Sequence, residues 1–136
     1  MTTINNTQNP LRFLLISCIF LFYCCKKEAG YGGDASISGH LRVYEVNGQF
    51  TDTIATFSGR DRYIYIRYDQ SIGYDKRIKS DYDGNYLFDH LYPGNYEIYT
   101  YSADASSPDG LKPIILKIKI NGRKEQFIAD TLNILQ

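Results

Sequence analysis

Side chains that could act as nucleophiles, general bases or metal ligands are few in this sequence and unevenly placed. All three cysteines, Cys18, Cys24 and Cys25, stand near the N-terminus, so the remainder of the chain has no thiol for a disulfide, a nucleophile or a metal site. The two histidines are His40 and His90, and a Ser-His-Asp triad would need one of them beside a nucleophile. Neither stands in such a pattern. We therefore expect structural or surface histidines and a protein that is not an enzyme.

The acidic segment 81–85 is a second place where chemistry could occur. Asp81, Asp83 and Asn85 surround Gly84 there, and Ca²⁺ is bound by several such oxygen atoms. The spacing and the terminal glutamate of an EF-hand loop are absent, however. Asp and Asn side chains also hydrogen bond to the backbone of their own turn, and we favour this interpretation. We expect no metal and no cofactor.

Tyrosine is the over-used residue, with 13 copies against 7 Phe and no Trp. Tyrosine favours strands and can lie half-buried, because one end of the side chain is apolar and the other polar. Tyr63 and Tyr65 share one face of a strongly alternating segment, and Tyr99 and Tyr101 share one face of another. If these strands are neighbours, the four rings form an exposed patch that could bind a sugar or a protein. The alternative is that the tyrosine pairs only stabilise an exposed sheet.

Two of the cysteines end an apolar segment, residues 13–25, that follows Arg12. A bilayer-spanning helix needs roughly 20 apolar residues, so this segment is too short to cross comfortably. It has the length of the hydrophobic region of a secretory signal, and Arg12 supplies the positive charge in front of it.

The junction Cys24-Cys25-Lys26-Lys27-Glu28 resembles the lipobox of bacterial lipoproteins. The resemblance implies cleavage just before a cysteine, acyl chains such as palmitate on its thiol, and a place in the cell envelope. We expect the lipid to anchor the protein in the outer membrane, and the sequence does not distinguish the periplasmic face from the cell-surface face. We favour Cys25 as the lipidated residue because a small residue, Cys24, precedes it, whereas cleavage before Cys24 would place bulky Tyr23 there. An ordinary secretory signal and a packed hydrophobic N-terminal helix are the competing interpretations.

Beyond the junction, the sequence predicts a glycine-rich tether and then one all-β domain. We divide the chain into a signal peptide or signal helix (1–24), a lipidated flexible tether (25–34) and a domain (35–136). Apolar residues in the domain recur with a period of two, and turn residues punctuate them regularly, which predicts an antiparallel β-sandwich of about seven or eight strands. Asn121-Gly122 has the sequence of a hairpin turn. The strands are expected near 35–46, 50–57, 63–68, 76–80, 85–88, 96–101, 114–120 (opened by Pro113) and 126–135.

Residues 80–98 resemble the signature of carboxypeptidase regulatory-like, or transthyretin-like (prealbumin-like), β-sandwich domains. The signature is a D-x-D-G turn, two alternating aromatic residues, a leucine, and then P-G-x-Y-x-apolar. The resemblance implies a sandwich in which two turns chain three antiparallel strands, and a non-catalytic accessory role. Hydrolases among transthyretin-like proteins carry several catalytic histidines and arginines, and no such set is present here. The matching positions are Asp81, Asp83, Gly84, Tyr86, Phe88, Leu91, Pro93, Gly94, Tyr96 and Ile98.

Charge and composition narrow the class of partner. Lys+Arg and Asp+Glu are both 15, so no basic excess is present to neutralise phosphates, and nucleic acid is not an expected partner. The expected partners are a membrane, through the lipid, and an envelope protein or a glycan.

Asp52-Thr53-Ile54 and Asp130-Thr131-Leu132 are similar to a short O-glycosylation pattern of envelope proteins. The leading interpretation is a membrane-anchored, non-enzymatic binding or scaffolding module, and the alternatives are a carbohydrate-binding accessory lipoprotein and, third, a cryptic enzyme.

Overall fold

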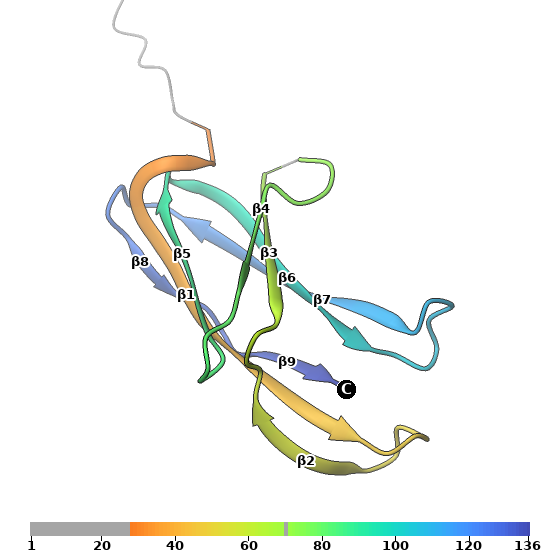
Figure 1. The fold of residues 1–136 in the computed structure, drawn as a ribbon. Coiled ribbons are helices and arrows are strands. Elements are labelled where there is room, and N and C mark those ends of the chain that lie inside the picture. The colour runs from red at the N-terminus through yellow and green to blue at the C-terminus, as the bar shows by residue number, and fades with distance from the viewer. Residues whose placement is uncertain (1–27, 70) are drawn as a thin grey trace, which may run out of the picture.

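The computed structural model describes residues 28–69 and 71–136 (Figure 1). The predicted signal peptide and both candidate lipidation sites, Cys24 and Cys25, lie outside the described residues. No helix in the described part of the chain is long and apolar enough to cross a membrane.

The described residues form nine strands in two sheets, which confirms the predicted all-β sandwich fold (Figure 1). Two pairings are parallel, those of β1 with β8 and β9, so the first sheet is mixed rather than wholly antiparallel. The first sheet contains β1 (Tyr31–Val46), β2 (Thr53–Ser58), β5 (Asn85–Leu91), β8 (Gln126–Ile128) and β9 (Leu132–Leu135). The second sheet has the order β4 (Lys76–Lys79), β3 (Tyr63–Tyr68), β6 (Gly94–Ala103) and β7 (Leu111–Ile120).

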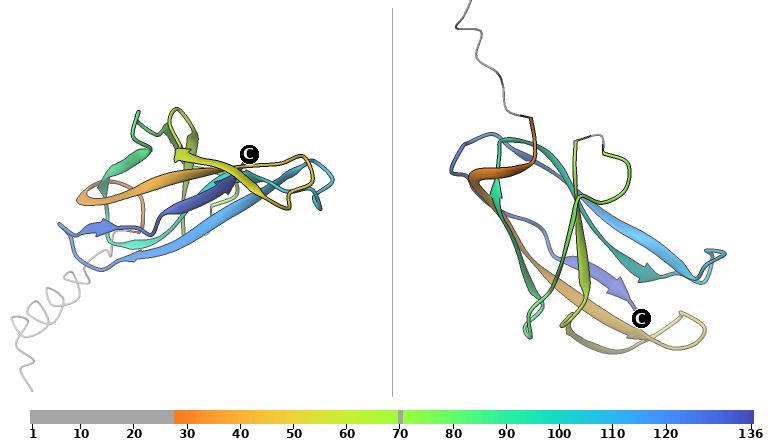
Figure 2. Two further views of the ribbon diagram at one scale, coloured as in Figure 1. Left: turned by 90° about the horizontal axis from the view of Figure 1, so that it is seen from below. Right: turned by 45° about the horizontal axis from the view of Figure 1, so that its top comes forward.

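The long strand β1 organises the first sheet. Its first half pairs with β5 and its second half with β2, so these two strands follow one another along the same edge. They meet at Leu41, whose N–H donates to the carbonyl of Gly84 and whose carbonyl accepts from the N–H of Gly59, both at 2.8 Å. The opposite edge of β1 pairs with β8 and β9, so the first and last strands of the domain lie side by side (Figure 2).

The core lies between the two sheets and follows the period-two pattern. Ile64 and Ile66 of β3 are fully buried, as are the alternate residues Tyr96 and Ile98 of β6. Their neighbours along each strand point to the opposite side of the sheet, because successive side chains of a strand alternate. The signature residues Tyr86, Phe88 and Leu91 of β5 and Tyr96 of β6 are all buried, as predicted.

The turns of the signature connect the two layers, and this corrects the predicted arrangement of its strands. The turn at 81–84 leads from β4 in the second sheet to β5 in the first, and the turn at Tyr92-Pro93 leads back to β6 in the second. The three strands are therefore not neighbours in one sheet. Local sequence specifies a turn but not the layer in which the next strand pairs.

The turn at 81–84 is held by its own polar groups, as predicted. The Asp81 carboxylate accepts hydrogen bonds from the N–H groups of Asp83 at 2.9 Å and Asn85 at 2.7 Å. These donors favour the ionised carboxylate, and they hold the pKa of Asp81 below its ordinary value, with the Asn85 backbone N–H as the largest cause.

The segment expected to be a flexible tether is partly strand, because β1 begins at Tyr31. Gly33 lies against β5, where a Cβ would stand 2.1 Å from the Leu91 carbonyl oxygen. The glycine there allows close approach of two backbones rather than flexibility.

Three further expectations about the C-terminal third were wrong. Asn121-Gly122 does not close a hairpin, because β7 pairs with β6 while β8 pairs with β1 in the other sheet. The expected strand 126–135 is divided into β8 and β9. Pro113 lies inside β7 rather than at its first position, which is tolerated because β7 is an edge strand with one unpaired side.

Candidate functional site

The four predicted tyrosines come together on the outer side of the second sheet. Strands β3 and β6 are neighbours, and their register places Tyr65 opposite Tyr99. These two rings stack with their centroids 5.2 Å apart and their planes 15° apart. Tyr101 meets both rings edge-on, at 5.8 and 5.9 Å, and Tyr63 lies 6.4 Å from Tyr65. Buried alternate residues hold the backbone of both strands against the core, so the rings stand on a rigid support.

A fifth ring, Tyr74, joins this cluster from the loop between β3 and β4. Its centroid is 5.2 Å from that of Tyr65, with the ring planes 62° apart. Sequence reasoning missed it because a loop residue has no strand alternation to place it. We call Tyr63, Tyr65, Tyr74, Tyr99 and Tyr101 the tyrosine face.

Two cations from β4 border the tyrosine face at Tyr63. The Arg77 guanidinium carbon lies 4.7 Å and the Lys79 ammonium 5.1 Å from the centre of the Tyr63 ring, within the range of cation–π attraction. Lys79 also forms an ion pair with Asp61 at 2.8 Å, and this hydrogen bond holds the pKa of Asp61 below its ordinary value. Basic and acidic groups therefore stand beside exposed aromatic rings.

Charged residues on β3, β6 and β7 border the tyrosine face on its other side. Arg67 on β3 forms an ion pair with Glu97 on β6, and Lys117 on β7 lies 3.7 Å from the same carboxylate. The Glu97 hydrogen bond is the main cause of a raised pKa of Arg67. Within the tyrosine face, the pKa of Tyr99 is raised. Partial burial is the largest cause, and the neighbouring Tyr101 is the second. The Tyr99 hydroxyl is therefore neutral at physiological pH and can both donate and accept hydrogen bonds.

A shallow hollow of about 310 Å³ adjoins the tyrosine face. It is lined by Tyr63, Tyr65 and Tyr101 together with Asp61 and Arg62. The same Asp61 and Arg62 also line a neighbouring hollow of about 650 Å³ at the turn between β2 and β3. An arrangement of aromatic rings beside carboxylate and guanidinium groups can pack against C–H surfaces while it hydrogen bonds to hydroxyl or amide groups.

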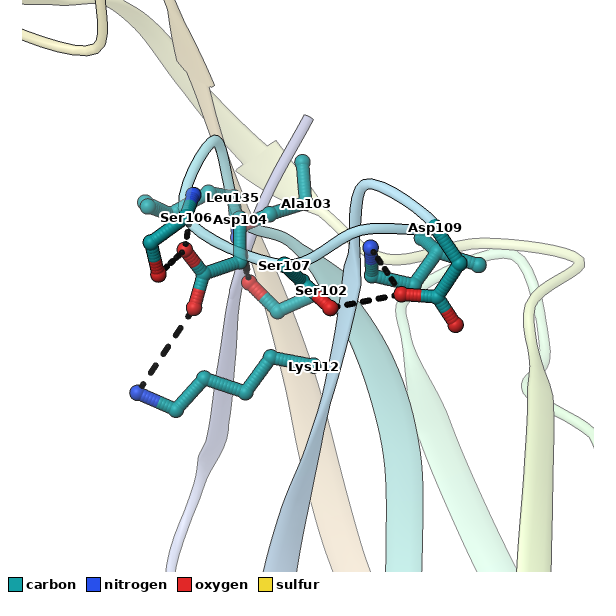
Figure 3. A network of polar contacts seen from close by, with 9 residues as sticks. Ser102, Ala103, Asp104, Ser106, Ser107, Asp109, Lys112 and Leu135 are labelled. Carbon is teal, nitrogen blue, oxygen red and sulfur yellow. Dashed lines mark hydrogen bonds and ion pairs between the residues drawn. The ribbon is translucent and has the colours of Figure 1, made fainter.

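A third hollow, of about 400 Å³, lies beside the loop between β6 and β7. The Asp104 carboxylate accepts hydrogen bonds from the backbone and hydroxyl of Ser106, at 2.9 and 2.6 Å, and forms a long ion pair with Lys112 at 4.0 Å (Figure 3). The Ser102 hydroxyl accepts from the Leu135 N–H at 2.9 Å, which ties β6 to β9. These polar contacts are directed within the protein, so we assign them a structural role.

The histidines lie in the first sheet, away from the tyrosine face. The His40 ring nitrogen Nε2 contacts the backbone oxygen of Asp83 at 2.9 Å. The exposed His90 pairs with Asp89 at 3.2 Å and lies against the Tyr31 ring. Within the residues that the structure describes, no group of three or more His, Cys, Asp or Glu side chains is arranged to hold a metal ion.

No family model and no curated protein matches this sequence. Solved structures with a distant likeness to this chain include the following two. A candidate carbohydrate-binding protein from Pseudomonas aeruginosa shares 13% identity with a TM-score of 0.47, over 79% of this chain and 92% of that protein. A structure of (S)-allantoin synthase shares 12% identity with a TM-score of 0.45, over 93% of this chain and 52% of the enzyme. The chain thus spans about half the length of that enzyme.

Proposed function

We propose that this chain is a lipid-anchored, non-enzymatic protein of the bacterial envelope that binds a partner through the tyrosine face. The observation that carries the proposal is the contact of five tyrosine rings on one side of one sheet. Tyr63, Tyr74 and Tyr101 are 43%, 51% and 45% exposed, so the cluster presents apolar surface to solvent. Single exposed rings are ordinary, whereas a contiguous aromatic patch with a polar border is typical of a binding surface.

A protein partner is the class of ligand that the tyrosine face favours. The rings of Tyr65 and Tyr99 stack, so each ring covers one face of the other, and cations lie over the ring of Tyr63. Part of the ring surface that a sugar would need for stacking is thus already covered. Rigid tyrosines that present edges and hydroxyl groups suit a protein surface, where tyrosine is enriched because it adds contact area at low entropic cost.

A carbohydrate ligand is the second candidate, and one observation favours it. The hollow beside Tyr63 and Tyr101 places Asp61 and Arg62 next to aromatic rings. These charged groups can hydrogen bond to sugar hydroxyls while an exposed ring packs against the sugar C–H surface.

Replacement of Tyr65 by alanine is expected to weaken partner binding at least about ten-fold, because Tyr65 contacts all four other rings of the tyrosine face. The measurement is a pull-down from envelope extract, together with a glycan array on the same protein. Tyr31→Ala is the matched control, because it removes an exposed ring from the first sheet. A signal on the glycan array alone would assign the carbohydrate ligand. Blank results in both assays, or equal binding by the Tyr65 variant, would contradict the proposal.

Replacement of Cys25 by serine is expected to abolish fatty-acid labelling and release the protein from the membrane, because a serine hydroxyl cannot replace the acylated thiol. Metabolic labelling with a fatty-acid analogue, followed by intact-mass measurement, checks this result. Cys24→Ser is the matched control and should keep its label. Undiminished label on the Cys25 variant would refute the assignment of this cysteine.

A further inference from the structure

The chain enters the domain at one end of the sandwich, and its entry point is fixed there. Ala29 packs against Gly94, where an added Cβ would lie 2.5 Å from the Ala29 Cβ. The Gly30 N–H donates to the Tyr96 hydroxyl at 3.0 Å, and the Gly30 carbonyl accepts from the Tyr92 N–H at 2.9 Å. The position of the chain is therefore determined from Ala29 onward, before β1 begins.

Two loops surround this entry point. Gly94 is opposite Ile120 in the register of β6 and β7, so the turn that follows β7 lies on the same side as Ala29. An added Cβ at Gly30 would lie 3.9 Å from the ring of Tyr68, the last residue of β3, which brings the loop after β3 to the same place. Figure 1 and the right-hand view of Figure 2 show the start of β1 and both loops at one end of the sandwich. We define the entry end as residues 28–31, 69, 71–76, 89–94 and 119–125.

An isoleucine stands at the tip of the first of these loops. Ile72 is fully exposed, and Gly73, with a φ of 90°, turns the chain directly after it. Asp75 holds this turn, because its carboxylate accepts hydrogen bonds from the Tyr68 N–H at 2.8 Å and the Ser71 hydroxyl at 3.0 Å. The loop thus holds an apolar side chain away from the domain, where its free energy falls if apolar surroundings cover it.

The second loop adds two cations. Arg123 and Lys124 are exposed, and neither takes part in an ion pair within the described residues. The neighbouring Glu125 is engaged by the turn itself, since its carboxylate accepts from the N–H groups of Gly122 at 2.7 Å and Asn121 at 2.8 Å. These donors, Gly122 first, hold the pKa of Glu125 below its ordinary value. The two cations remain available to an anionic surface.

The two ends of the sandwich also differ in charge. The far end, residues 52, 60–62, 79–83 and 104–112, holds six aspartates and four cations. The entry end, together with Lys26 and Lys27 in front of it, holds six cations and five acidic residues. An anionic lipid surface therefore attracts the entry end more than the far end.

We propose that the entry end rests on the membrane surface, with Ile72 among phosphate-bearing lipid headgroups and Arg123 and Lys124 against the phosphates. This inference rests on the proposed lipid anchor at Cys25. A residue spans at most about 3.6 Å, so the Cα atoms of Cys25 and Glu28 are at most about 11 Å apart. The anchor thus holds the entry end within about one tether length of the headgroups. Cations and interfacial apolar side chains are the groups that bind such a surface.

This orientation leaves the tyrosine face accessible. Tyr68 ends β3 and Gly94 begins β6 at the entry end, whereas Tyr63 and Tyr101 lie toward the other ends of the same strands. The tyrosine face then points along the membrane rather than into it. A partner that binds this face meets it beside the bilayer.

Photo-crosslinking of the full-length protein in cells grown with radioactive phosphate tests the proposal. A photoreactive phenylalanine analogue in place of Ile72 is expected to attach phosphate-labelled lipid to the protein on illumination. The same analogue in place of Ala105, an exposed residue of the far end, is the control. It should give no label above that of cells kept in the dark.

A pair of charge reversals tests the contribution of the cations. With the analogue at residue 72, Lys124→Glu should reduce the lipid label at least about three-fold, because the reversed charge is repelled by lipid phosphate. Lys112→Glu makes the same change at the far end and should leave the label unchanged.

The outcomes separate this inference from the anchor on which it rests. Equal label at residues 72 and 105, an adduct of residue 72 with another protein in place of lipid, or equal label in the two lysine variants would overturn the inference and leave the anchor intact. A mature protein that carries no acyl group, by intact-mass measurement, would overturn the anchor and the inference together.

Discussion

Replacement of Tyr96 by alanine is expected to lower the free energy of unfolding by about 3–5 kcal/mol, the usual cost of removing a large buried aromatic side chain. Tyr96, the third residue of β6, is 1% exposed. Its ring meets that of Tyr68 edge-on, with centroids 5.7 Å apart and planes 80° apart. Chemical denaturation monitored by circular dichroism measures the change. An unaltered unfolding midpoint would contradict the placement of this ring in the core.

The Tyr96 hydroxyl adds a second contribution that a matched variant separates. It accepts a hydrogen bond from the Gly30 N–H at 3.0 Å and donates to the Tyr92 carbonyl, so it fastens the segment before β1 to the turn before β6. Tyr96→Phe keeps the ring and removes only the hydroxyl. We expect it to cost about 1–3 kcal/mol, which is the penalty for leaving buried polar groups without a partner. A Phe variant as unstable as the alanine variant would show that the hydrogen bonds dominate over ring packing.

Replacement of Gly84 by alanine is expected to destabilise the fold by about 2–5 kcal/mol, from backbone strain together with overpacking. Gly84 has a φ of +83°, and a Cβ there would lie 2.6 Å from the Leu41 carbonyl oxygen and 2.9 Å from the Gly59 nitrogen. Both atoms are backbone atoms of the junction where β2 and β5 meet on β1, so they cannot move without loss of hydrogen bonds. Thermal and chemical unfolding measure the effect.

Gly110→Ala separates the two causes, because Gly110 has a similar φ of +71° and no atom within 4 Å of an added Cβ. It should show only the conformational cost, about 1–2 kcal/mol. Equal destabilisation by the two substitutions would mean that the close approach at Leu41 contributes nothing.

The sequence predicts individual strands well where one face is buried and the other is not. Ile64 and Ile66 alternate with Tyr63 and Tyr65, and this period of two exists because the sandwich buries one side of β3. In β1 the signal is weaker, since Gly32 and Gly33 mimic a linker. The contact that explains Gly33 is made with Leu91, far away in the sequence, so no local pattern could reveal it.

Partners of strands are harder to predict than strands, and the candidate site shows the same limit. Asn121-Gly122 suits a hairpin, but the residues that decide where β8 pairs are on β1. The tyrosine face could be expected only on the condition that β3 and β6 are neighbours. Tyr74 and the cations of β4 lie at the tyrosine face because of contacts between different elements, and no spacing in the sequence predicts such contacts.

The pairing of β1 with β8 and β9 has a consequence for the order of assembly. A chain that emerges from the ribosome with its N-terminus first exposes β1 early, yet both strands that complete one edge of β1 are made last. Contacts between such distant segments require closure of a large loop, and folding dominated by them is slow. The domain therefore cannot finish folding while β8 and β9 are still being synthesised.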